Sequence, residues 1–252
     1  MFSRLLAVTT LALGANVYAG DFSVSSGLDY SRGSYGESQS SETWYLPVIG
    51  RYEAGPLTLK LTLPYLRTSG PVTRTPGGPG AGGAATVSSR GSASGQGDVV
   101  TSAGYALLEG MNRSWMVEII GKVKLPTADK DKGLGSGKTD YSVQLDLAKP
   151  VAAVTVFGTA GWKKFGDPDG MNMRDPLFLS VGLAHKLGPA VTVGAAYDWR
   201  QKVTTRGYQV SELSVFVTRR LAESWKMQTY FVTGFSDASP DMGGGLMLTR
   251  LF

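Results

Sequence analysis

Apolar and polar side chains alternate with a period of two along most of this chain. In residues 115–125 every second residue is apolar or glycine, and the register between them carries Glu118, Lys122 and Lys124. A second alternation begins at about Asp140, after a polar and glycine-rich segment. Because successive side chains of a strand point to opposite faces, both segments predict strands with one apolar and one polar face.

The same alternation repeats along the chain and predicts about twelve strands. We expect them near residues 21–32, 43–53, 57–68, 98–108, 115–125, 140–148, 151–163, 177–186, 191–200, 208–220, 225–235 and 244–252. Nearly every strand has the same two faces, and no helical pattern is available to cover either. A closed barrel in lipid satisfies this pattern, since its outer face is apolar and its inner face is polar. The predicted fold class is therefore all-β, a transmembrane antiparallel β-barrel.

The connections between the predicted strands alternate between long and short. Ala54–Pro56 and Lys149–Pro150 are short turns, whereas residues 69–97 are rich in Gly, Ala, Ser and Pro and have no period. If the N-terminus starts in the periplasm, the short turns are periplasmic and the long loops extracellular, as in bacterial barrels. The segment 69–97 is either a constriction folded into the lumen or an external loop, and we favour the external loop.

Residues 1–19 have the pattern of a secretory signal peptide. Arg4 gives a positive start, Leu5–Ala15 a short apolar core, and Val17–Ala19 a small-residue cleavage pattern. We therefore expect the signal peptide at residues 1–19 and a single domain, the barrel, at residues 20–252. Beyond the signal, no run of about 18 apolar residues predicts a membrane helix. The predicted location is the bacterial outer membrane, with outer-membrane lipid around the barrel.

The composition excludes several kinds of chemistry. There is no cysteine, so neither a disulfide framework nor a thiolate metal site can form. The net charge of +5 is spread over many strands without a basic block, which gives no support for nucleic-acid binding. The 34 glycines suit tight turns and long loops.

The polar register supplies the candidate functional residues, because it faces the lumen of the predicted barrel. Charges of both signs are nearly balanced there, and they allow two interpretations. Either the charges pair and seal the lumen, or they line a narrow aqueous path and tune its selectivity. The lumen-lining candidates are Lys60, Glu118, Lys122, Lys124, Asp140, Gln144, Asp146, Asp198, Arg200, Glu212, Arg220 and Lys226.

The single histidine, His185, is the only residue on which histidine-dependent catalysis could rest. It shares the lipid-facing register of Leu183 and lies beside the short turn at Leu187, at the predicted periplasmic rim. Barrel lipases and proteases need their histidine near the outer mouth. We therefore predict no catalytic residue and no enzyme activity.

Two kinds of segment suggest ligands but lack the required spacing. Residues 133–139 are similar to a phosphate-binding loop, yet Lys132 stands where the motif needs glycine, and no helix follows. Acidic side chains in two loops could contact a hard cation, but they depart from the spacing of a calcium loop. We predict no metal and no cofactor. The acidic loop residues are Asp129, Asp131, Asp167, Asp169 and Asp175.

Several short phrases occur in a characteristic order and spacing along the mature chain. They are Leu63-Pro64-Tyr65 with Gly70 after it, Gly97-Asp98, Lys124-Leu125-Pro126-Thr127, Leu134-Gly135-Ser136-Gly137, Thr139-Asp140-Tyr141 and Gly234-Phe235-Ser236-Asp237-Ala238-Ser239-Pro240-Asp241. Together they resemble a known family of outer-membrane transporters, that of the MetA-pathway of phenol degradation, a relative of the fatty-acid and aromatic-hydrocarbon channels. The resemblance implies a barrel that passes small molecules, aromatic or hydrophobic ones among them, and it carries over no catalytic residue. The terminal Phe252 resembles the carboxyl-terminal signal that the barrel assembly machinery reads.

The sequence leaves more than one function open. The hypothesis that we favour is passive uptake of a small-molecule solute through the polar lumen. The alternative is an integral barrel without a conducting path, which serves envelope structure or surface contact. A barrel lipase or protease is the weakest hypothesis, because His185 lies at the wrong end of its strand.

Overall fold

The computed structural model describes residues 20–74, 85–87, 91–108, 115–168, 170–205 and 207–252. No helix in these ranges is long and apolar enough to cross a membrane. The regular elements are β1 (Asp21–Gly33), β2 (Ser41–Ala54), β3 (Leu57–Ser69), β4 (Val72–Arg74), β5 (Ala85–Val87), β6 (Ser92–Gln96), β7 (Val99–Leu108), β8 (Met116–Leu125), β9 (Asp140–Val151), β10 (Val154–Lys164), β11 (Leu177–Lys186), β12 (Val191–Arg200), β13 (Val210–Ala222), β14 (Trp225–Gly234) and β15 (Met242–Leu251).

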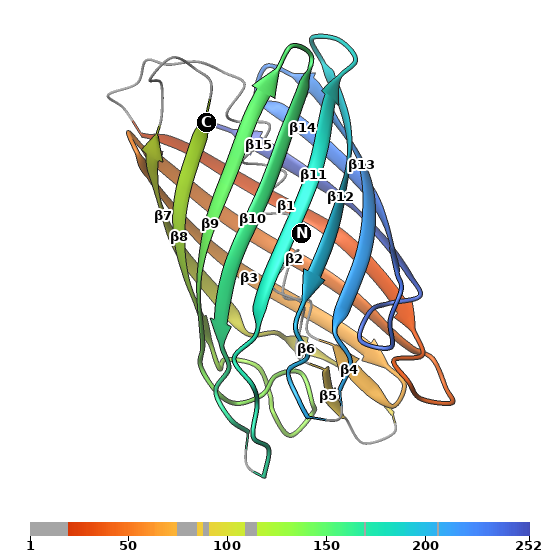
Figure 1. Cartoon of the computed structure of the whole chain (residues 1–252). Helices are drawn as coiled ribbons and strands as arrows, with labels where there is room; N and C mark the ends of the chain where they lie inside the picture. The colour runs from red at the N-terminus through yellow and green to blue at the C-terminus, as the bar shows by residue number, and fades with distance from the viewer. Residues whose placement is uncertain (1–19, 75–84, 88–90, 109–114, 169, 206) are drawn as a thin grey trace.

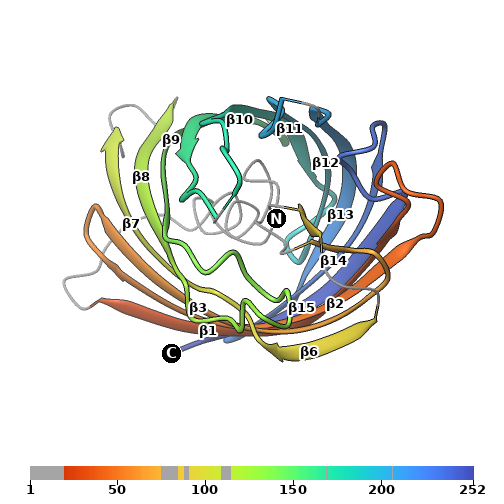
Figure 2. The ribbon, with the colours of Figure 1, turned by 90° about the horizontal axis from the view of Figure 1, so that it is seen from below.

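The long strands close into a ring of antiparallel neighbours. The sheet runs from β2 through β1 and β15 back down to β7 and β3, and a further pairing of β2 with β3 closes it. The short strand β6 extends beside one end of β3, so twelve of the thirteen strands in this sheet form the ring. Figures 1 and 2 show the ring from the side and along its axis. The predicted antiparallel barrel is confirmed.

The outer face of the ring is apolar, as the alternation predicts. On β3 the side chains of Leu57, Leu59, Leu61 and Leu63 are 37 to 45% exposed, and all four point to the same face. The other strands repeat this arrangement, so a continuous apolar belt surrounds the ring. A surface of this extent cannot face water in a stable soluble protein, and it is the surface that a barrel presents to lipid.

Leaving aside the connection between β7 and β8, which is mostly outside the described residues, the short connections lie at one end of the ring and the longer ones at the other, and we call these the turn end and the loop end (Figure 1). One predicted turn is wrong. Lys149 and Pro150 continue β9 and pair with Val156 and Thr155 of β10, because a strand tolerates proline near its end. The chain turns two residues later, and Ala152 there has a φ of 54°.

The predicted unstructured segment 69–97 is also partly wrong. Its last residues form β6, which pairs with β3 from Tyr65 to Ser69. Between Tyr65↔Gln96 and Thr62↔Val100, three residues of one strand face two of the other, so the wall has a one-residue bulge at residues 97–99. Val99, which the alternation places outward, is buried beside this bulge. The parts of this prediction at residues 75–84 and 88–90, like the signal peptide at 1–19, lie outside the described residues.

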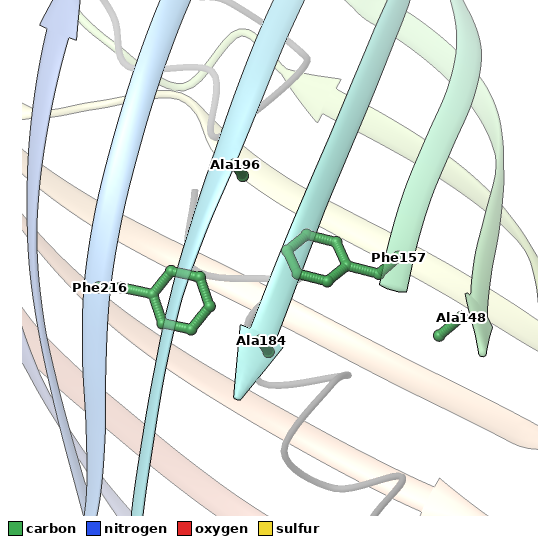
Figure 3. Close-up of a cluster of buried hydrophobic side chains, with 5 residues drawn as sticks. All are labelled: Ala148, Phe157, Ala184, Ala196 and Phe216. Carbon is green, nitrogen blue, oxygen red and sulfur yellow. The ribbon is translucent and has the colours of Figure 1, made fainter. Parts of the chain in front are cut away.

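Aromatic side chains on the inner face lie flat against glycines of the neighbouring strand. Phe157 on β10 is paired with Gly182 on β11, and Phe216 on β13 is paired with Gly194 on β12. A Cβ atom added to either glycine would collide with the ring of its partner. The rings therefore take the space that the glycines leave, and they form a compact apolar layer on the inside of the wall (Figure 3).

We expect Gly182→Val to destabilise the barrel by about 1–3 kcal/mol, because the new side chain must displace the Phe157 ring. Urea unfolding in detergent micelles, followed by the gel-mobility difference between folded and heated barrel, measures this change. Gly121→Val on β8 is the matched control, since a Cβ atom at Gly121 meets no atom within 4 Å. Equal unfolding midpoints for the two variants would contradict the packing described here.

Candidate functional site

The candidate site is the inner face of the ring. The register of the strands places all twelve predicted lumen residues on this face, and several of them are nearly inaccessible to solvent: Asp140, Gln144, Asp198, Arg200 and Lys226. Each inward side chain has one neighbour on either adjacent strand, so the register also determines which residues follow one another around the ring. The pairing brings the charged residues together in rows of one sign.

The first row is basic, and it crosses β1, β2, β3, β7, β8, β9 and β10. Direct pairing joins Arg51 to Lys60, and Ser102 lies between Lys60 and Lys122. Ser142 then lies between Lys122 and Lys163. We call this set the basic row, and its members are Ser23, Arg51, Lys60, Ser102, Lys122, Ser142 and Lys163.

The second row is acidic, and it crosses β8 to β13. Glu118 is paired with Asp146, and Asp198 is paired with Glu212, so like charges are directly opposite in both pairs. Asp146 also accepts hydrogen bonds from the amide of Gln144 at 2.7 Å and from the hydroxyl of Thr159 at 2.6 Å. We call this set the acidic row, and its members are Glu118, Asp146, Thr159, Ser180, Asp198 and Glu212.

The remaining cationic candidates lie at the two ends of the ring. Arg220 is paired with Lys226 near the turn end, where β13 leads into β14. Arg200 lies near the loop end, between Phe178 of β11 and Val210 of β13. Charges of one sign are therefore adjacent at the turn end, as they are in the two rows.

Opposite charges form a connected network at the loop end, in addition to the Arg51–Glu53 pair near the turn end. The Lys124 ammonium lies 2.8 Å from the Asp98 carboxylate and 3.3 Å from that of Asp140, and Lys163 lies 3.4 Å from Asp140. The backbone N–H of Gly166 also donates to Asp140 at 3.1 Å. The side chains of Asp98 and Asp140 are each 3% exposed. We call Asp98, Lys124, Asp140 and Lys163 the mouth network.

The mouth network holds the segment 126–139, which we call the inward loop. Leu134 at its centre is fully buried against Leu66 on the inner face of β3. The Thr127 hydroxyl donates to the carbonyl of Gly97 at 3.0 Å and accepts from the N–H of Val99 at 2.9 Å, so it joins the loop to the bulge. In Figure 2 this loop, drawn in green between β8 and β9, lies within the ring.

Residues 133–139, which are similar to a phosphate-binding loop in sequence, belong to this inward loop. Gly133 and Gly137 have positive φ angles, of 69° and 66°, and the loop folds inward because Leu134 packs on Leu66. The Lys124 ammonium also donates to the Ser136 hydroxyl at 2.9 Å. Several of the phrases that carry the family resemblance meet here, including 97–98, 124–127 and 134–137.

The inner face also has an apolar wall, which the sequence analysis missed. Phe157, Phe216 and three alanines from β9 to β13 form one buried cluster, against which Met116 and Tyr230 pack (Figure 3). Tyr230 also packs on a second cluster, Ile49 with Met247. The signal available in the sequence was aromatic residues in the polar register, whereas their pairing with glycines is known only from the strand register. We call this surface the apolar wall, and its alanines are Ala148, Ala184 and Ala196.

His185 lies outward and exposed, as predicted, at the end of β11 next to the short turn. Its cross-strand partners are Val154 and Val193. No nucleophile is paired with it, and the imidazole has no access to the lumen from this face. The described geometry therefore offers no catalytic role for this residue.

Three of the acidic loop residues, Asp129, Asp167 and Asp175, accept hydrogen bonds from backbone N–H groups. The Asp129 carboxylate accepts N–H bonds from Asp131 at 3.0 Å and Lys132 at 3.2 Å, and the bond from Lys132 holds its pKa below the ordinary value. Asp167 accepts from the N–H of Met173 at 2.8 Å. In the part of the chain that the structure describes, no three acidic or histidine side chains are grouped to hold a metal ion. Asp169 lies outside it.

The fold and its inner face define an outer-membrane β-barrel. Similar solved structures are an outer membrane channel from Pseudomonas putida F1, with 14% identity, a TM-score of 0.68 and coverage of 95% of this chain and 97% of that one. The KdgM porin has 11% identity, a TM-score of 0.56 and coverage of 91% and 99%. The TodX ΔS2S3 mutant monoaromatic hydrocarbon channel has 11% identity, a TM-score of 0.51 and coverage of 94% and 91%. These likenesses establish the fold.

The chain belongs to the family of the MetA-pathway of phenol degradation, whose model matches residues 14–249. No curated protein matches the sequence. The family agrees with the resemblance drawn from the short phrases, and it covers the whole described barrel up to β15.

We expect Lys124→Met to release the inward loop, because it leaves two nearly buried carboxylates, Asp98 and Asp140, without their shared cation. Removing one partner of a buried ion pair costs on the order of 3–5 kcal/mol, which the loop can relieve by moving outward. Cleavage by proteinase K between β8 and β9, added to the folded barrel in vesicles, measures the release.

Lys132→Met is the control for this experiment, since its ion pair with Asp129 is exposed and contributes little. Faster cleavage of the Lys124 variant alone is the expected result. If both variants resist the protease as well as the parent protein, the mouth network does not hold the loop.

Proposed function

We propose that this barrel is a channel for the passive passage of small molecules across the outer membrane, aromatic and hydrophobic ones among them. The observation that carries the proposal is the apolar wall. Its aromatic rings face inward, toward the lumen, in a register that barrels usually give to polar residues. An apolar inner surface of this kind can contact an apolar solute as the solute passes through the lumen.

The construction of the wall suits such passage. Phe157 and Phe216 lie flat over glycines and are 9% and 3% exposed, so they form the floor of the apolar wall and do not project far into the lumen. Stacked or edge contacts with aromatic rings stabilise a bound ring by about 0.5–1.5 kcal/mol each. Weak contacts repeated along a surface retain a solute briefly and still let it leave, as conduction requires.

The comparisons support the proposal at the level of the class. The family takes its description from phenol degradation, and two of the similar structures are described as channels, one of them for monoaromatic hydrocarbons. Because their identity to this chain is low, these structures support only the fold. The class of solute is inferred from the side chains of the lumen.

A second candidate function is a barrel without a conducting path. The mouth network and the inward loop favour it, because they place chain and paired charges within the loop end of the ring. A barrel lipase or protease is the weakest alternative, since His185 points outward at the turn end.

The targeting predictions remain part of the proposal. We infer that residues 1–19 direct export and that the assembly machinery recognises the last strand through Phe252. In the folded barrel, Phe252 donates its N–H to the carbonyl of Phe22 at 2.9 Å, and the two rings lie 5.8 Å apart. Outer-membrane lipid surrounds the apolar belt.

Currents across planar lipid bilayers test the proposal. We expect the purified barrel to give discrete current steps, and benzyl alcohol to interrupt them more than glycerol does. Phe216→Ala should shorten the interruptions about fivefold, which corresponds to losing one ring contact of about 1 kcal/mol.

Phe231→Ala is the matched control, because Phe231 lies on the neighbouring strand β14 but faces lipid. It should leave the interruptions unchanged. A barrel that inserts and never passes current, even after the inward loop is released, would support the non-conducting alternative.

A further inference from the structure

The basic row and the apolar wall together point to a narrower class of cargo. We propose that the lumen binds organic anions that carry an apolar ring, such as aromatic carboxylates, with the carboxylate on Arg51 and Lys60 and the ring on the apolar wall. This inference rests on the proposed channel function and adds the charge of the solute to it.

The basic row combines features of a carboxylate site. Arg51 and Lys60 are directly opposite one another, and like charges in that position destabilise a sheet. Among the residues that the structure describes, none forms an ion pair with Lys60 within 4 Å, whereas Arg51 is bonded to Glu53. Glu118 of the acidic row acts on both cations at longer range, and a bound anion between Arg51 and Lys60 would relieve the repulsion that remains.

The groups of the row also match the geometry of a carboxylate. The Arg51 guanidinium carries donors in a fixed fork, and its bond to Glu53 uses one amino group of that fork. The Nε of Arg51 is buried and has no hydrogen-bond partner in the described structure. Ser102, on the far side of Lys60, adds a hydroxyl donor within the row.

The apolar wall reaches the basic row on β2. Ile49 and Arg51 point to the same face and are two residues apart, a spacing of about 7 Å along a strand. Ile49 packs with Met247, and Tyr230 joins both to the larger cluster around Phe216. A ring held against Ile49 and Met247 would therefore place an attached carboxylate beside Arg51.

The acidic row does not offer the corresponding site for a cationic ring. Asp146 already accepts hydrogen bonds from Gln144 and Thr159, so its capacity for a bound ammonium group is reduced. Its paired neighbour Glu118 lies two positions from Met116, on the opposite end of the wall from Tyr230. The combination of free donors and a nearby apolar surface is found at Arg51 and Lys60.

Four small probes separate ring from charge: benzoate, benzyl alcohol, benzylamine and acetate. Isothermal titration of the folded full-length barrel in detergent measures binding without conduction, and interruption of bilayer currents measures it during passage. We expect benzoate to bind at least about tenfold more tightly than each of the other three, because benzyl alcohol and benzylamine lack the charge-assisted hydrogen-bond pair and acetate lacks the ring.

Lys60→Gln should bring benzoate down to the level of benzyl alcohol and leave benzyl alcohol unchanged. Lys186→Gln is the matched control, since Lys186 is an inward cation on β11 outside the basic row. It should leave the preference for benzoate intact. Both substitutions remove one positive charge, so a general change in the potential of the lumen would affect them equally.

The outcomes distinguish this inference from the channel function. Current without a preference for benzoate, or with a preference for benzylamine, overturns the inference and leaves the channel. Tight benzoate binding in detergent without any current overturns the channel and leaves the binding site. An equal loss of preference in the Lys60 and Lys186 variants would assign the effect to net charge and overturn the site.

Discussion

The structure depends on the need to satisfy every backbone hydrogen bond inside lipid. No water is available there to pair with a free strand edge, so β1 must pair with β15 as well as with β2. Closure then fixes the two faces of every strand and the neighbours of every inward side chain. The apolar belt follows from the first condition, and the order of residues around the lumen follows from the second.

The inner face is built by matching neighbours across strands. Glycines accept the rings of Phe157 and Phe216, serines separate the three lysines of the basic row, and Thr159 donates to Asp146. Opposite charges meet in the mouth network, where they hold a loop, and at Arg51 and Glu53, whereas like charges are neighbours along the two rows. Lys163 belongs to both the basic row and the mouth network, so it joins the surface that a solute would meet to the side chains that hold the loop.

The sequence predicts the barrel well because the alternation of apolar and polar residues shows which side chains of a strand point to lipid and which point to the lumen. The alternation of Leu57 to Leu63 with Lys60 between them is sufficient to place each side chain outward or inward. The alternation does not show which residues of neighbouring strands are paired. The two charged rows and the packing of rings over glycines could therefore be found only from the strand register of the structure. β6 has no apolar alternation, since it consists of Ser, Ala, Gly and Gln. The inward position of Leu134 depends on its contact with the distant Leu66.

The direction of the basic row has a consequence for motion. The row begins at Ser23, near the start of β1 at the turn end, and finishes at Lys163, near the end of β10 at the loop end. Because the strands are tilted relative to the barrel axis, a row of paired residues follows a helical path around that axis. A solute whose charged group stays in contact with the basic row must therefore rotate about the barrel axis as it moves along the lumen. Its ring would contact successive strands around the barrel rather than one strand along its length.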